Sequence, residues 1–173
     1  MYNNFLAYIQ QLELIAFFSG YPLVYATIFF IADNRRFKNN FITHTVQLLP
    51  LAYALVGSLF LGFLLKKLYP DYSVENIKHA IQQPYLVVWG LLSILFWVPA
   101  LSKKKIWSLL HGLVFFLVIV KDMFFQLTAQ TDNDIVKNDM KVYLSSIILN
   151  LGALIITGLI SFFYTRRKKL LMP

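Results

Sequence analysis

The stretch LFWVPALSKKKIWSLLHGLVFFLVIVKDMFFQL (residues 95–127) decides the fold. Within it, the lysines 103–105 separate two long apolar runs. The two runs together are too long for one straight helix across about 30 Å of hydrocarbon. A membrane-embedded position for three lysines would also be costly. The stretch therefore predicts a tight hairpin between two membrane-spanning helices.

The composition of the whole chain agrees with a membrane protein. The 173 residues are 58% hydrophobic and only 14% charged, whereas a water-soluble domain of this size needs more polar surface. The apolar residues form long blocks rather than amphipathic stripes, which is typical of membrane spans. The chain has no cysteine, so disulfides, thiolate metal ligands and cysteine nucleophiles are excluded.

Five apolar blocks each approach the roughly 20 residues that cross a bilayer. We expect the spans at residues 14–32, 46–65, 85–101, 106–126 and 142–164. The connecting segments are too short to fold as separate units. The predicted fold class is therefore all-α, a polytopic integral membrane protein in which five transmembrane helices form one domain over residues 1–173.

The distribution of Lys and Arg predicts the orientation. Ten of the sixteen basic residues fall on one predicted side together with a single acid, a net charge of +9, and the other side carries a net charge of −1. The basic clusters on the first side are Arg35, Arg36 and Lys38, then Lys103, Lys104 and Lys105, then Arg166, Arg167, Lys168 and Lys169. The positive-inside rule places the N-terminus outside and the C-terminus in the cytoplasm, as in a multi-pass protein of the plasma (bacterial inner) membrane. Because topology explains the net charge of +8, nucleic-acid binding is not expected.

The first predicted span contains SGYP (residues 19–22) near its centre. Pro22 lacks an N–H and its ring clashes with the carbonyl of residue 18, so a kink is expected there. Such a kink can expose backbone carbonyls to ions. An ordinary kink whose freed groups are bound by neighbouring helices is the favoured interpretation.

The last predicted span carries a stripe of small and polar residues on one helical face. Such a face lets helix backbones approach and form hydrogen bonds, so we expect it to face other helices, with a solvated pathway as the alternative. The stripe consists of Ser146, Asn150, Ala153, Thr157 and Ser161, and Tyr164 follows it.

The fourth predicted span contains ionisable residues, which in a membrane are candidates for function. His111 and Asp122 share one face but lie about 16 Å apart along it, so they cannot contact each other within one straight helix. Lys121 can extend its long stem to the interface and is interpreted as an anchor. Asp122 is too short to do so, and it faces either lipid headgroups or Asn150 and the bundle interior. We therefore regard Asp122, Asn150, His111 and Lys121 as a possible intramembrane polar site.

No metal or cofactor is expected. His44 and His111 could hold a haem axially, but no flanking motif supports this. Oxygen-rich loops are interpreted as solvated segments rather than cation sites. These loops contain Asp71, Glu75 and His79 in one case, and Asp132 and Asp134 in the other.

Catalytic signatures are missing, so the chain is not expected to be an enzyme. The sequence has no Gly-rich phosphate loop, no HExxH and no nucleophile elbow. The leading hypothesis is a non-enzymatic membrane subunit that packs, within the lipid bilayer, with other membrane proteins or with itself as a homo-oligomer. The alternative is an oligomeric ion channel or small-solute transporter whose path is lined by the fourth and fifth helices. A lipid- or cofactor-binding membrane enzyme is a third, weaker hypothesis.

Overall fold

The computed structural model describes residues 2–33, 40–81, 83–128 and 133–171, and these ranges contain helices and no strand. Within them, four helical segments are long and apolar enough to cross a membrane: Gln10–Ala32, His44–Leu68, Lys105–Gln126 and Asn138–Arg167. They match four of the five predicted spans to within a few residues. The chain is thus an all-helical bundle with four candidate membrane-spanning helices.

The third predicted span, residues 85–101, is shorter than expected. It consists of α5 (Pro84–Leu92), the 3-10 helix η2 (Ser93–Trp97) and α6 (Pro99–Ser102). Pro99 disfavours the helical conformation for the residue before it, and Val98 is extended with φ −72° and ψ 124°. The continuous apolar helix therefore ends at Trp97, so five full-length spans are not established.

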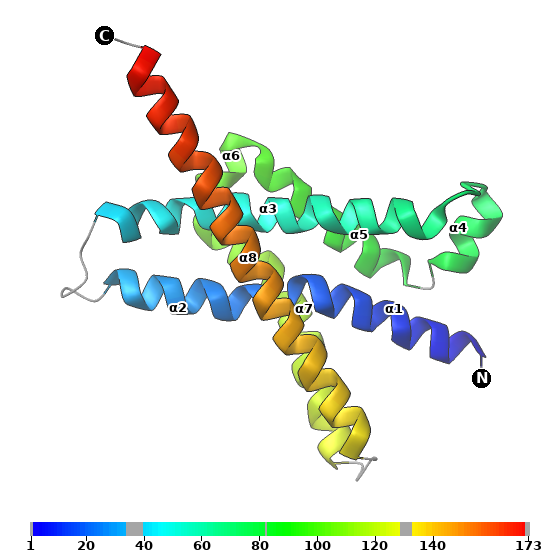
Figure 1. Ribbon diagram of the computed structural model, residues 1–173. Helices are drawn as coiled ribbons and strands as arrows, with labels where there is room; N and C mark the ends of the chain where they lie inside the picture. Colours follow the sequence, from blue (N-terminus) through cyan, green and yellow to red (C-terminus); the bar gives the residue numbers. More distant parts are fainter. Residues whose placement is uncertain (1, 34–39, 82, 129–132, 172–173) are drawn as a thin grey trace.

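The first candidate span is divided into α1 (Tyr2–Phe18) and α2 (Tyr21–Asp33) by a turn at Ser19 and Gly20. Pro22 lies in the first turn of α2. Backbone N–H groups in a first turn have no acceptor within the helix, so proline costs no helical hydrogen bond there. Ser19 still closes α1, because its backbone N–H donates to the Ile15 carbonyl at 3.0 Å and its hydroxyl to the same oxygen at 2.7 Å. The chain thus breaks and resumes as a second helix in nearly the same direction (Figure 1).

The next helix, α3 (Asn40–Leu68), runs antiparallel to α1 and α2 (Figure 1). The short α4 (Val74–Ala80) follows it and turns the chain back into α5. The ion pair between Lys67 Nζ and Glu13, at 2.7 Å, connects α3 with α1.

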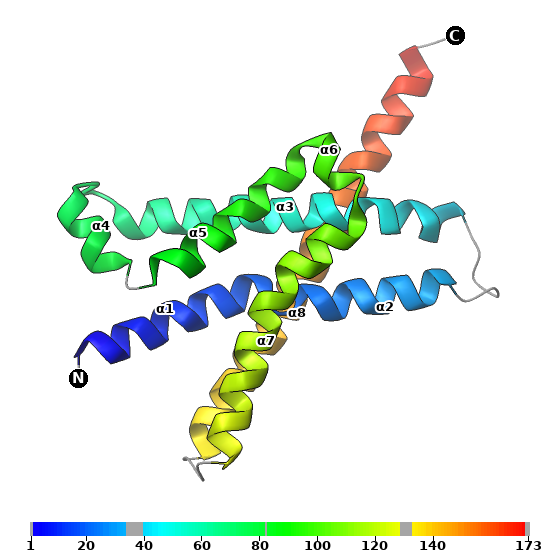
Figure 2. The same cartoon turned by 180° about the vertical axis from the view of Figure 1, so that it is seen from behind.

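The helices α1, α2 and α3 lie side by side as a layer (Figure 1). The helices α7 (Lys105–Thr128) and α8 (Asn133–Leu171) cross this layer obliquely, one on each face. In Figure 1, α8 passes in front of the layer, and in Figure 2, seen from behind, α7 does so. The hairpin between α6 and α7 that the three lysines predicted is present as a turn between Ser102 and Lys105. The break between α1 and α2 therefore lies between two crossing helices.

Aromatic rings fill the interior where these helices meet. Phe18 stacks on Phe115 with ring centroids 4.7 Å apart, and Tyr21 lies 4.2 Å from Tyr53. All four side chains are at most 1% exposed. In the described part of the chain, side chains consequently fill the centre of the bundle. The helix α3 contributes most of the other hydrophobic residues of this buried core.

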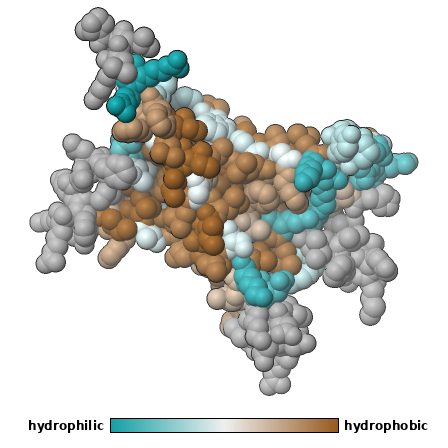
Figure 3. Space-filling model, viewed as in Figure 1, coloured by the Kyte–Doolittle hydropathy of each residue, from teal (hydrophilic) through white to brown (hydrophobic). Residues whose placement is uncertain are grey.

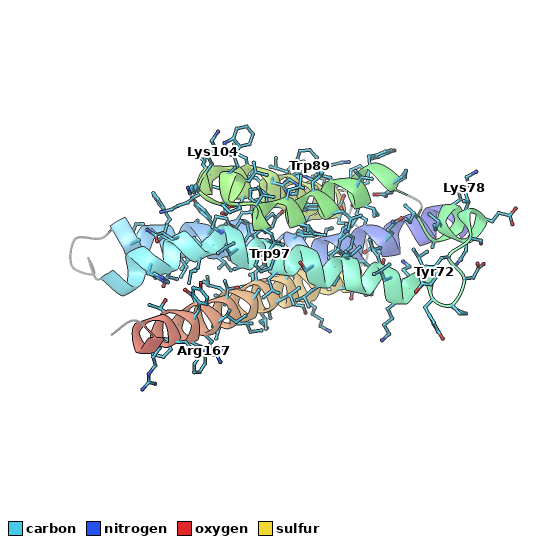
Figure 4. All side chains as sticks on the ribbon, turned by 90° about the horizontal axis from the view of Figure 1, so that it is seen from above. Tyr72, Lys78, Trp89, Trp97, Lys104 and Arg167 are labelled. Atoms are coloured by element: carbon cyan, nitrogen blue, oxygen red, sulfur yellow. The ribbon has the colours of Figure 1, made fainter. Side chains whose placement is uncertain are left out.

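The face of the bundle seen in Figure 3 is largely apolar along its middle, and hydrophilic residues gather toward the ends. Lys104 and Arg167 lie toward one end, whereas Tyr72 and Lys78 lie toward the other (Figure 4). This distribution is compatible with a multi-pass membrane protein.

Candidate functional site

A hollow of about 470 Å³ opens at the end of the bundle where α1 begins and α7 ends. We call it the polar hollow. Its wall is formed by Tyr8 and Gln11 of α1, Gln83 before α5, and Lys121, Asp122, Phe125 and Gln126 of α7. Most of these residues are polar, although the neighbouring helix surfaces are apolar. It is therefore the best candidate for a functional site.

Asp122 is half-buried and faces α1 across this hollow. Its carboxylate accepts a hydrogen bond from Gln11 Nε2, and Gln83 Nε2 donates to Gln11 Oε1 at 3.4 Å. Lys121 is exposed beside it. Of the two environments considered for Asp122 from the sequence, the structure thus provides the bundle side, with Gln11 as the bound neighbour rather than Asn150.

A second carboxylate, Asp139 of α8, lies behind the wall of the hollow. Only 2% of this residue is exposed. Tyr8 Oη donates to Asp139 Oδ1 at 3.0 Å, and Gln126 Nε2 donates to Oδ2 at 2.7 Å. Hydrogen bonds to both oxygens offset part of the cost of burying a carboxylate. The ion pair among the described residues joins Lys67 and Glu13 and does not involve Asp139. The hydrogen-bond donors to Asp139 are therefore neutral side chains.

Sequence reasoning did not identify Asp139, although a signal for it existed. Asp139 precedes Ser146 by seven residues and Asn150 by eleven. On a helix with 3.6 residues per turn, these spacings place it on the same face as the polar stripe. The stripe therefore extends two turns further than predicted, to the residues behind the wall of the hollow.

Both carboxylates act on the hydroxyl group of Tyr8. Burial raises the pKa of Tyr8 to about 12, and the hydrogen bond to Asp139 and the negative charges of Asp139 and Asp122 act in the same direction. Tyr8 is therefore a proton donor to Asp139 over the whole physiological pH range.

The predicted stripe on α8 packs against the break between α1 and α2. Ser146 Oγ accepts a hydrogen bond from the Gly20 N–H at 2.8 Å, and Asn150 Nδ2 donates to the Phe17 carbonyl at 2.9 Å. Ala153 and Thr157 are buried further along the same face. Ser161 is half-buried and Tyr164 is exposed, so the packed face ends between Thr157 and Tyr164.

Asn150 belongs to this packed face and not to the polar hollow. Its Nδ2 atom also donates to the Ser146 carbonyl at 2.8 Å, within α8. Its Oδ1 atom is buried and has no hydrogen-bond partner among the described residues. The structure therefore separates Asn150 from Asp122, which the sequence had grouped in one polar site.

His111 lies in an aromatic environment elsewhere in the bundle. Its Nδ1 atom shares a hydrogen bond of 2.8 Å with the Tyr53 hydroxyl. Trp89 stacks on the imidazole with centroids 4.7 Å apart and an interplanar angle of 6°. Its Nε2 atom is buried and has no partner in the described part of the chain. His111 is thus an interior packing residue in this structure, apart from both Asp122 and Asn150.

Among the described residues, the side chains that could have held a metal do not gather at one place. Across the described ranges, no three His, Asp or Glu side chains come close enough to hold an ion. The side chains of His79 and Asp134, and the whole of Asp132, lie outside the described residues. Asp71 and Glu75 are exposed.

The polar hollow can therefore accept a small polar or cationic group. Asp122 and Lys121 line it, Asp139 lies behind its wall, and glutamine and tyrosine side chains supply hydrogen bonds.

The comparisons with known proteins found no likeness: no family model matches the chain, and no curated protein or solved structure matches it.

Proposed function

We propose that the chain crosses the membrane five times, with α5, η2 and α6 as a short third crossing, the N-terminus outside and the C-terminus in the cytoplasm. The helix ends that meet at the polar hollow support this topology. The polar hollow joins the start of α1, Gln83 and the end of α7. Because α7 ends on the side where α5 begins, α7 starts on the opposite side, and the segment from α5 to α6 has to connect the two.

Accessibility to labelling tests this topology, since the chain has no cysteine. Tyr72→Cys and Lys103→Cys introduce single thiols at two exposed positions. A membrane-impermeant maleimide applied to intact cells should label Tyr72→Cys at once and Lys103→Cys only after permeabilisation. Labelling of both from the same side would contradict five crossings, and the reverse order would contradict the orientation.

In this membrane, we propose, the protein acts as a non-enzymatic subunit that packs with other membrane proteins or with copies of itself. The observation that carries the proposal is the polar hollow. A polar hollow at the end of a bundle, with Asp122 half-buried in its wall, suits a cationic or hydrogen-bonding side chain of a partner. In addition, only 28% of the residues in the spans of α7 and α8 are buried within the chain, against 50% or more in the first two spans. Both helices therefore have apolar faces available to a partner.

Purification from the native membrane in mild detergent tests the subunit proposal. A partner, or a second copy, should co-purify in a fixed ratio, and Asp122→Asn should weaken its retention. Glu75→Gln is the matched control, because Glu75 is an exposed acid at the same end of the bundle. If the wild-type protein elutes as a stable monomer with nothing bound, the proposal is wrong.

The channel or transporter remains a second candidate because of one observation: Asp122 and Asp139 both lie at the hollow, near the outer end of α7 and α8. Carboxylates at such a depth are typical of cation routes. Against it stand the buried rings of Phe18, Tyr53 and Phe115, which fill the centre of the single chain. Flux into liposomes that is reduced by Asp122→Asn would favour transport, and absence of flux would leave the subunit proposal.

A further inference from the structure

A second cavity, of about 640 Å³, lies between α3 and α8 at the end opposite the polar hollow. We call it the apolar groove. It is formed by His44, Thr45 and Leu48 near the start of α3 and by one face of residues 154–165 of α8. Its volume is within the range of ligand sites, about 300–1,000 Å³. The two helices diverge toward this end (Figure 1), and most of the residues that line the groove are apolar.

The chemistry of the groove changes along its length. Leu48 and Leu154 of its lining are buried, whereas Thr45, Ser161 and Thr165 are less buried and lie nearer the end of the bundle that carries Arg167. Arg166 and Arg167 follow Thr165 directly, and both are exposed. In the described part of the chain neither is in an ion pair, and the lining of the groove contains no acid. An occupant that matches this sequence of environments has a long apolar tail and an anionic end.

We propose that the apolar groove binds an anionic phospholipid, with one acyl chain between α3 and α8 and the phosphate beside Arg166 and Arg167. Basic residues at the ends of membrane helices attract anionic headgroups, and a groove between helices adds apolar contact with the chain. In the proposed orientation this end faces the cytoplasmic leaflet, which carries anionic lipid. The inference rests on the membrane placement proposed above and does not depend on the identity of a partner protein.

Gly158 allows a sharp test of the acyl-chain position. It lines the groove, and a Cβ added to it would meet no atom within 4 Å. Gly158→Leu should therefore fill the groove without a clash. Gly152 lies on the same helix outside the groove, and a Cβ there also meets nothing within 4 Å, so Gly152→Leu is a matched control.

The experiment is native mass spectrometry of the full chain released from nanodiscs of phosphatidylcholine mixed with phosphatidylglycerol. We expect one phosphatidylglycerol retained in preference to phosphatidylcholine. Arg166→Gln with Arg167→Gln should weaken this retention about twenty-five-fold, because each basic residue beside an anionic surface contributes roughly a factor of five. Lys103→Gln with Lys104→Gln removes the same charge from the end of the bundle where Lys104 and Arg167 lie, and should have little effect (Figure 4).

Gly158→Leu should abolish the retention and Gly152→Leu should preserve it. Equal retention of the two lipids, equal effects of the two basic pairs, or normal retention by Gly158→Leu would each overturn the inference. It would also be overturned if Gly158→Leu changed the oligomeric state instead, because a second copy would then occupy the groove. Failure of the chain to enter nanodiscs would contradict the proposed membrane placement, whereas entry without lipid selectivity contradicts only the lipid site.

Discussion

The backbone N–H of Gly20 donates a hydrogen bond to Ser146 Oγ at 2.8 Å, across 126 positions of sequence. This bond joins the break in the first candidate span to the polar face of α8. A backbone donor freed by a helix break has to be bound inside a bilayer, where water is absent. The serine of the crossing helix binds it, and the close approach of the two backbones depends on the missing side chain at Gly20.

Gly20→Ala should destabilise the fold. A Cβ at this position would lie 2.6 Å from the Ser146 carbonyl carbon and 2.7 Å from Ile147 Cα, which are backbone atoms that cannot move aside cheaply. We expect a loss of about 1–3 kcal/mol, measured as a lower midpoint of thermal unfolding in mild detergent. Gly62→Ala is the control, since a Cβ at Gly62 meets nothing within 4 Å. Equal midpoints for the two variants would show that α8 does not pack closely on the break.

Ser146→Ala should leave the Gly20 N–H buried without its acceptor. Hydrogen bonds between membrane helices contribute about 0.6 kcal/mol on average and up to about 1.7 kcal/mol, and we expect a loss toward the upper value because both groups are fully buried. The neighbouring Ser145 is exposed and donates to Lys141 in its own helix. Ser145→Ala should therefore cost much less in the same unfolding assay, and a reversed order of the two variants would contradict the structure.

The bond between Tyr8 and Asp139 should appear as a coupling free energy. Tyr8→Phe removes the donor, and Asp139→Ala the acceptor, of the charge-assisted hydrogen bond of 3.0 Å that connects α1 and α8. A double-mutant cycle on the free energy of unfolding should give a coupling of about 0.5–3 kcal/mol. Additive effects would mean that the two side chains do not interact.

Alkaline pH should destabilise the protein partly through Tyr8. Burial raises its pKa from 10.0 to about 12, so the folded state holds the proton more tightly than the unfolded state does. This contribution to stability is complete below pH 10 and is lost as the pH rises through about 12. The fall in unfolding midpoint from pH 9 to pH 11 should thus be smaller for Tyr8→Phe than for the wild type. Tyr85→Phe, at an exposed position, should behave as the wild type does.

Much of the helical framework could be predicted from the sequence. Four apolar blocks predicted four long helices, because a membrane requires runs of about 20 apolar residues and each block is bounded by polar ones. The third block was predicted too long. Its Pro99 disfavours helix at Val98, and hydropathy alone does not register this backbone effect.

The candidate site was harder to predict. Helical periodicity showed which residues of α8 share a face, but it could not show which helix would lie opposite them. The pairing of Asp122 with Gln11 and the burial of Asp139 depend on α1 lying beside α7 and α8. Sequence spacing contains no information on such contacts between helices more than 100 residues apart.

The sequence by itself determined that the chain forms apolar helices of membrane-spanning length, that α8 has one small and polar face, and that basic residues gather at particular helix ends. Those properties follow from local composition and from the 3.6-residue period of a helix. Only the tertiary structure decided what the polar face binds. Where two helices cross at the backbone of Gly20, the partner of each buried polar group is set by packing geometry, and that geometry is a property of the assembled bundle.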